Sequence, residues 1–153
     1  MPLTPVYSER LGVPLRWWVQ GTMLVATLWL AVAVALPALA AWLVTAVALG
    51  LLFAWLWAYG SPRISVGDGT FRAGRAHIDA RFLGPATALD AEETHRVAGV
   101  RADARAYLLL RPYLKRAVKV EIADPADPTP YWLVSTRHPE DLVRALTALT
   151  QAG

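Results

Sequence analysis

The chain has 153 residues, of which 56% are apolar and 18% charged, and its formal net charge is +3. Residues 17–62 contain no Asp, Glu, Lys, Arg or His, whereas the rest of the chain has the charge density of an ordinary soluble protein. The composition therefore argues against an entirely soluble protein and against a disordered chain, which would be poor in apolar residues.

The uncharged stretch predicts two membrane-spanning helices after a cytoplasmic N-terminal segment, residues 1–16. Pro37 divides the stretch into residues 17–36 and 38–59, which as helices reach roughly 30 and 33 Å and so can each cross the hydrocarbon core. Pro37 suits a turn because it lacks an N–H and disfavours helix at the residue before it. We therefore expect a transmembrane hairpin over residues 17–60.

Two alternatives to a spanning hairpin remain open. The tip, residues 35–39, carries no polar side chain to hold it in water, which fits a re-entrant pair that never crosses. A cleaved signal peptide is the other alternative, because Arg10 and Arg16 resemble its charged region and residues 38–40 resemble a cleavage site. The length of the first apolar segment and the second span directly after it favour the hairpin.

Aromatic and basic residues predict the orientation of the hairpin. Rings gather where the stretch begins and ends, which indicates one headgroup interface: Trp17, Trp18, Trp55, Trp57 and Tyr59. Arginines flank the stretch on both sides, and the turn has none: Arg10, Arg16, Arg63, Arg72 and Arg75. The positive-inside rule then places both termini in the cytoplasm and the chain in the plasma membrane.

Small residues recur at every fourth position in both apolar segments, which allows helix backbones to approach closely. They are Thr27, Ala31 and Ala35 in the first segment, and Ala46, Gly50, Ala54 and Ala58 in the second. One interpretation is that these ridges close the hairpin within one chain. The other is that they form the seam of a homodimer.

Residues 61–153 predict a β-rich cytoplasmic α+β domain. Turn residues separate short apolar runs that we expect to form strands: residues 64–66, 70–73, 76–79, 81–83, 86–89, 106–111, 117–122 and 131–135. Gly84-Pro85 is expected to break the chain between two of them. Asp90, with Glu93 three residues later, predicts a capped helix that ends near Gly99.

A final amphipathic helix is expected to begin at Pro139. Its apolar stripe, Leu142, Val143, Leu146 and Leu149, should close one end of the strand core. Short strands followed by a C-terminal helix match the element order of a pleckstrin-homology-like split barrel. The likeness concerns element order alone and implies no function.

The densest basic run is a candidate binding site for anionic lipid headgroups: Arg111, Tyr113, Lys115, Arg116 and Lys119. Each basic residue near an anionic leaflet contributes about 1 kcal/mol, and Tyr113 adds an interfacial ring. The alternative is an ordinary solvated loop between two strands.

Residues 124–137 form the second candidate site. A proline-stiffened loop with Asp124 and Asp127 leads into Tyr131 and Trp132, and then to Arg137. Immobilising a rigid loop costs little entropy, which suits contact with a ligand or partner. The alternative is a stiff turn in which Trp132 enters the core and Arg137 pairs with Asp124 or Asp127.

Several motifs carry a family resemblance. These are residues 7–11 (YSERL) ahead of the Trp-rich hairpin, residues 89–92 (LDAE), the pair Arg111-Pro112, and above all residues 124–137 (DPADPTPYWLVSTR). Together they resemble an actinobacterial family of small two-span membrane proteins of unknown function. The resemblance implies two spans with a cytoplasmic domain, and it implies no activity.

No catalytic or cofactor motif is present. The absence of cysteine excludes disulfides and thiolate chemistry, and His77, His95 and His138 lack metal-ligand spacing. We therefore expect no cofactor and no metal. We also expect no nucleic-acid partner, because the positive charge is small and dispersed. The favoured function is a membrane-anchored binding or scaffold domain. The alternatives are an accessory subunit of a larger membrane protein and an enzyme that uses Asp90, Glu92 or His95.

Overall fold

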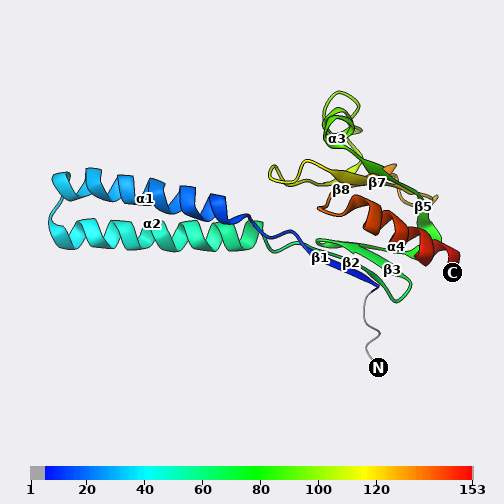
Figure 1. Cartoon of the computed structure of the whole chain (residues 1–153), viewed down its shortest axis with the longest axis horizontal. Helices are drawn as coiled ribbons and strands as arrows, with labels where there is room; N and C mark the ends of the chain where they lie inside the picture. The colour runs from blue at the N-terminus through cyan, green and yellow to red at the C-terminus, as the bar shows by residue number, and fades with distance from the viewer. Residues whose placement is uncertain (1–5, 153) are drawn as a thin grey trace. The chain divides into compact units, whose positions relative to one another are not determined.

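A computed structural model describes residues 6–152 and divides the chain into two compact units (Figure 1). Residues 12–61 form a helical unit. Residues 6–11 and 62–152 together form a β-rich unit.

The helical unit contains two helices, α1 (Leu15–Ala35) and α2 (Ala38–Tyr59). They match the two expected segments, and Leu36 between them is extended, as a residue before proline should be. Both helices are long and apolar enough to cross a bilayer. Only 6% and 17% of their most apolar windows are buried, whereas the core helix of a soluble protein would be mostly buried.

The helices pack through residues other than the small-residue ridges. A Cβ at Gly21 would lie 2.9 Å from Leu52 Cδ2, so the glycine admits the leucine side chain between the helices. The buried positions of α2 are Ala41, Thr45 and Leu56. The ridge residues are exposed instead: Thr27, Ala31, Ala35, Ala46, Gly50, Ala54 and Ala58. The interpretation that these ridges close the hairpin is therefore wrong, because the helices turn a different face toward each other.

The first sheet has the order β1-β2-β3-β4, all antiparallel. Its strands are β1 (Tyr7–Arg10), β2 (Arg63–Gly67), β3 (Thr70–Ala73) and β4 (Ala76–Asp79). Strand β1 was not expected, since residues 1–16 were assigned to a separate segment. It pairs with β2, and the backbone N–H of Leu11 donates to the Pro62 carbonyl at 3.0 Å. In sequence, the helical hairpin is thus an insertion between two paired strands.

The second sheet has the order β5-β7-β8-β6. Its strands are β5 (Leu83–Leu89), β7 (Ala117–Ile122), β8 (Tyr131–Ser135) and β6 (Tyr107–Leu109), and only β6 and β8 are parallel.

Two expectations near β5 are wrong. Residues 81–83, expected as a strand, lie largely in a 3-10 turn (η1, Ala80–Phe82), and Gly84-Pro85 lies within β5 rather than breaking it. The strand tolerates proline because it is at a sheet edge and shifts register there. Glycine is needed beside it, since a Cβ at Gly84 would lie 3.0 Å from the Glu121 carbonyl oxygen.

Two helices complete the β-rich unit. Helix α3 (Ala91–Ala98) begins as expected, with Asp90 Oδ1 accepting from the Glu93 N–H at 2.8 Å. Helix α4 (Pro139–Ala152) begins at the expected proline, and its Leu142 and Leu146 are fully buried. The expected docking of this stripe on the strand core is confirmed, since both leucines share one cluster with residues of the two sheets.

The β-rich unit has two apolar clusters. The main one joins the inner faces of the sheets and α4, and it contains Phe71, Val120 and Trp132. A smaller one lies beneath α3 and contains Leu89, Val97, Ala117, Tyr131 and Leu133. Strand β8 contributes Trp132 and Val134 to the main cluster and Tyr131 and Leu133 to the smaller one, and all five of its residues are buried.

Candidate functional site at the basic end of the β-rich unit

The first sheet has a basic end and an acidic end. At the basic end the chain leaves after β1 and returns before β2, and Arg10 lies directly opposite Arg63. Arg75, in the turn between β3 and β4, lies at the same end, because the Gly74 N–H donates to the Arg63 carbonyl at 2.9 Å. The turn with Asp68 and the end of β4 at Asp79 lie at the opposite end of the strands.

The basic loop, residues 111–116 between β6 and β7, is fixed at the basic end. The Tyr113 hydroxyl donates to the Leu11 carbonyl at 2.8 Å, and Leu11 is fully buried at the point where the chain leaves the β-rich unit. The Arg111 N–H donates to Ser135 Oγ at 3.1 Å, which fixes the start of the loop on β8. The predicted basic run therefore lies beside the chain's exit toward the helical unit.

The structure does not keep all the basic residues of this run together. Arg116 forms an ion pair with Glu140 at the start of α4. Lys119 lies on β7 with its ammonium 4.7 Å from the ring centroid of Tyr131. Lys115 is exposed and makes no ion pair with any described residue. The positive charge offered by the loop is therefore smaller than the sequence suggests.

The acidic loop, residues 124–130, is a self-contained turn. Asp124 Oδ1 accepts from the Ala126 N–H and Asp127 Oδ1 accepts from the Thr129 N–H, both at 2.9 Å. The hydrogen bonds from Thr129 lower the pKa of the Asp127 carboxyl. The Ala123 N–H donates to the Phe82 carbonyl at 2.8 Å, which fixes the loop beside η1. The two aspartate side chains thus accept hydrogen bonds from backbone N–H groups of their own loop.

The aromatic residues that follow the acidic loop are structural. Trp132 is 5% exposed, and its ring lies 5.7 Å from that of Phe71 and 5.1 Å from that of Tyr107. Tyr131 is 8% exposed, and its hydroxyl accepts from the Asp103 N–H at 3.2 Å. The structure therefore places Trp132 in the core, as the alternative interpretation of this segment proposed, and leaves neither ring available to a ligand.

Arg137 pairs with Glu9, not with Asp124 or Asp127 as the alternative interpretation expected. Its guanidinium lies 3.8 Å from Glu9 and donates to the Arg10 carbonyl at 3.1 Å. The register explains the difference, because β8 carries the chain away from the acidic loop before Arg137 is reached.

A buried carboxylate, Glu9, was missed by sequence reasoning. Only 9% of its side chain is exposed. Its Oε2 accepts from the Tyr7 hydroxyl at 2.7 Å and from the Thr136 hydroxyl, and its Oε1 accepts from the Arg137 N–H at 3.0 Å. We call these four residues the Glu9 cluster. The signal in the sequence was the alternation in residues 7–10, which turns Tyr7 and Glu9 to the same face.

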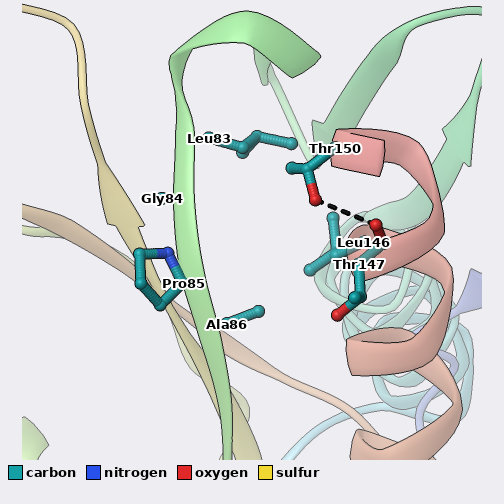
Figure 2. A pocket seen from close by; sticks show the side chains of 7 residues that line it. All are labelled: Leu83, Gly84, Pro85, Ala86, Leu146, Thr147 and Thr150. Carbon is teal, nitrogen blue, oxygen red and sulfur yellow. Dashed lines mark hydrogen bonds between the residues drawn. The ribbon is translucent and has the colours of Figure 1, made fainter. Parts of the chain in front are cut away.

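A hollow of about 320 Å³ lies between β5 and α4 (Figure 2). Leu83, Ala86 and Leu146 give it apolar walls, and the Thr150 hydroxyl beside it donates to the Thr147 carbonyl at 2.9 Å. None of the residues that line it is titratable. Among residues 6–152 no group of three or more His, Asp or Glu side chains is placed to hold a metal ion. The hollow therefore has no acid–base group among the residues that line it.

Comparison with known proteins gives a family and no activity. A family model described as "Protein of unknown function (DUF3093)" matches residues 6–146. The chain belongs to this family. The match includes both halves of the Glu9 cluster, which lie at opposite ends of the DUF3093 region. No curated protein matches the chain, and no solved structure does.

The Glu9 cluster should make the β-rich unit less stable at alkaline pH. Burial, more than the neighbouring carboxylate, raises the pKa of Tyr7 above its ordinary value of 10.0, and the hydrogen bond with Thr136 opposes this. The unfolded chain then loses the Tyr7 proton before the folded chain does. Stability should be unaffected by Tyr7 below about pH 10 and should fall as the pH rises beyond it.

Urea unfolding of the full chain in detergent between pH 8 and pH 11 measures this loss. Tyr7→Phe should show a shallower alkaline fall, since that variant lacks the titrating hydroxyl. Identical slopes for the wild type and Tyr7→Phe would show that Tyr7 does not cause this loss of stability.

Proposed function

We propose that this DUF3093 protein is a two-span membrane protein of actinobacterial type. Its β-rich unit, a pleckstrin-homology-like split barrel in element order, acts as a non-catalytic binding or scaffold module on the cytoplasmic face of the plasma membrane. The exposed apolar surfaces of α1 and α2 support this proposal, as do the arginines on both sides of the hairpin. Both termini are then cytoplasmic.

Aromatic rings within the helical unit support the membrane assignment. Trp17 stacks on Tyr59 with ring centroids 6.4 Å apart, and Trp55 stacks on Tyr59 at 5.4 Å. These rings lie together at the open end of the hairpin, where α1 begins and α2 ends. Amphipathic rings prefer the headgroup layer, so they favour a bilayer interface at this level.

The observation that carries the function is the hydrogen bond from Tyr113 to Leu11. It holds the basic loop next to the residue after which the chain enters the hairpin, so membrane insertion brings the loop close to the lipid surface. The screening length at physiological salt is about 8 Å, and each basic residue near an anionic leaflet contributes about 1 kcal/mol. We infer that the loop orients the β-rich unit on anionic headgroups.

The test uses the full chain in lipid nanodiscs. Because the chain has no cysteine, Pro112→Cys places one fluorophore on the basic loop and Ala126→Cys places one on the acidic loop. Quenching by spin-labelled headgroups should rise with the fraction of phosphatidylglycerol for the Pro112 label and should fall as salt is added. The Ala126 label should not respond.

Two variants sharpen the result. Tyr113→Phe removes only the hydroxyl that holds the loop to Leu11, so it should weaken the response of the Pro112 label without changing any charge. Lys115→Gln should weaken it by about fivefold, the equivalent of about 1 kcal/mol. Equal quenching in neutral and anionic discs would leave the loop an ordinary solvated turn. Single cysteines at Val6 and Ala152 report the orientation in intact cells, where an impermeant thiol reagent should reach neither.

A second candidate function is favoured by the exposed small-residue ridges on α1 and α2. Such ridges suit close packing against another helix, from a larger membrane protein or a second copy. The chain would then be an accessory subunit. A stoichiometric partner that co-purifies in mild detergent distinguishes this function from a self-sufficient lipid-binding module.

A further inference from the structure

The outer face of the first sheet carries exposed basic side chains on β3 and in the turn after it. Arg72 alternates with buried residues of β3, and its direct partners across the sheet, Ser65 and His77, carry no negative charge. Arg75 lies in the β3–β4 turn, and both arginines are exposed. Neither arginine forms an ion pair with any of residues 6–152. We call Arg72, Arg75 and His77 the Arg72 face.

The acidic loop carries negative charge that is also unpaired within the described chain. Asp124 and Asp127 accept backbone N–H groups of the loop through Oδ1, and neither forms an ion pair with a described residue. Hydrogen bonds from Thr129 lower the pKa of Asp127, so this carboxylate stays ionised at neutral pH. Glu121, exposed near the end of β7, adds a third negative charge beside the loop.

The two charged surfaces begin at opposite ends of β4. Arg75 directly precedes this strand, whereas the strand ends at Asp79, roughly 10 Å away, and continues into η1. The Ala123 N–H donates to the Phe82 carbonyl at 2.8 Å, so the acidic loop is fixed beside η1. Three prolines stiffen the loop and keep it at its own end of the β-rich unit. The unit is therefore electrically polar, with a positive and a negative end.

We propose that the β-rich units of two copies associate head to tail, with the acidic loop of one copy on the Arg72 face of the other. Charge complementarity selects a second copy as the occupant, because each surface finds its opposite on the same chain. A loop that is already rigid loses little conformational entropy on binding, which favours a contact through this loop. The contact is heterologous, so a pair keeps one free face and one free loop, and further copies can add at either end.

Disulfide crosslinking of the full chain in mild-detergent micelles tests the contact, because the chain has no cysteine of its own. One preparation carries Ala126→Cys on the acidic loop and the other carries His77→Cys on the Arg72 face, both at exposed positions. When the two are mixed and oxidised, a mixed dimer should form, and its yield should fall as salt is added. The matched control replaces His77→Cys by Ala104→Cys, an exposed position outside the Arg72 face, and should give little mixed dimer.

The same substitutions placed in one preparation or the other distinguish a head-to-tail contact from a general loss of folding. Arg72→Gln/Arg75→Gln in the His77→Cys preparation should lower the yield of mixed dimer about fivefold, as expected for two exposed ion pairs of about 0.5 kcal/mol each. In the Ala126→Cys preparation the same two substitutions should not lower the yield, because that copy contributes only its loop to the crosslinked contact.

Asp124→Asn/Asp127→Asn keeps the acceptor oxygens of the loop and removes its charge, so it should lower the yield only in the Ala126→Cys preparation. Equal losses in both preparations would contradict a head-to-tail contact. A yield that ignores salt would place the contact in the helical unit, and equally abundant dimers of Ala126→Cys with itself would reduce it to random collision. If no mixed dimer forms but polyglutamate slows the reaction of the His77→Cys thiol with a maleimide, the Arg72 face binds a different acidic partner and the proposal is wrong.

Discussion

Trp132→Ala should lower the free energy of unfolding of the β-rich unit by about 3–5 kcal/mol, the usual cost of truncating a buried tryptophan. The ring packs on Phe71 and Tyr107 in the main cluster and is 5% exposed, so its removal leaves a large cavity. Domains are stable by about 5–15 kcal/mol, so the variant loses much of its margin. Urea titration of the full chain in detergent, read by the protease resistance of the β-rich unit, measures the loss.

A matched control in the second sheet separates the effect of losing a buried side chain from the effect of any substitution there. Leu108 lies on β6 and is 42% exposed, so Leu108→Ala should change the unfolding midpoint little. Trp132→Phe should fall between the wild type and Trp132→Ala, because a smaller ring refills part of the space. An unchanged midpoint for Trp132→Ala would place the ring outside the core and restore it as a candidate ligand contact.

The helical hairpin could be predicted from the sequence because its signals are local. An uncharged run, one proline in its middle and a glycine at its end are sufficient to place α1 and α2. The face on which the helices meet could not be predicted. Small residues at every fourth position indicate that a helix face can pack closely, but they do not identify the helix that packs against it. Helices α1 and α2 meet through Gly21 and Leu52 instead.

Strand β1 could not be predicted because its evidence is not local. Four residues make a weak strand signal, and the partner strand begins only at Arg63, beyond the whole hairpin. Strand β5 was shortened in prediction because Gly84-Pro85 normally ends a strand. A sheet edge with a register shift accommodates both residues, and edge position cannot be read from one segment.

The candidate site was predicted in part. The basic run is a loop between two strands, but its position beside Leu11 depends on a contact between residues 102 positions apart in sequence. Tyr131 and Trp132 looked available for binding because they follow a stiff polar loop. They are buried because β8 is covered on one face by the other sheet and on the other face by α3. Two covered faces produce a continuous apolar run instead of an alternating one.

Glu9→Ala should destabilise the β-rich unit by about 2–4 kcal/mol, because it leaves the hydroxyls of Tyr7 and Thr136 without their carboxylate acceptor. Glu9 joins β1 to the segment between β8 and α4, so the variant should loosen both. Hydrogen exchange on the full chain should rise in residues 7–10 and 136–138, while β7 keeps its protection. The urea midpoint measured by protease resistance gives the size of the loss.

The control for Glu9 is Glu140, whose carboxylate pairs with Arg116 at an exposed position. Glu140→Ala should cost no more than about 1 kcal/mol, because surface ion pairs contribute little. Glu9→Gln keeps the size of the side chain and one acceptor oxygen, so it should cost less than Glu9→Ala. If Glu9→Ala and Glu140→Ala had equal effects, the Glu9 cluster would be no more than a surface contact. A larger effect at Glu9 would show that the strand before the hairpin is held to the start of α4 by this one buried carboxylate.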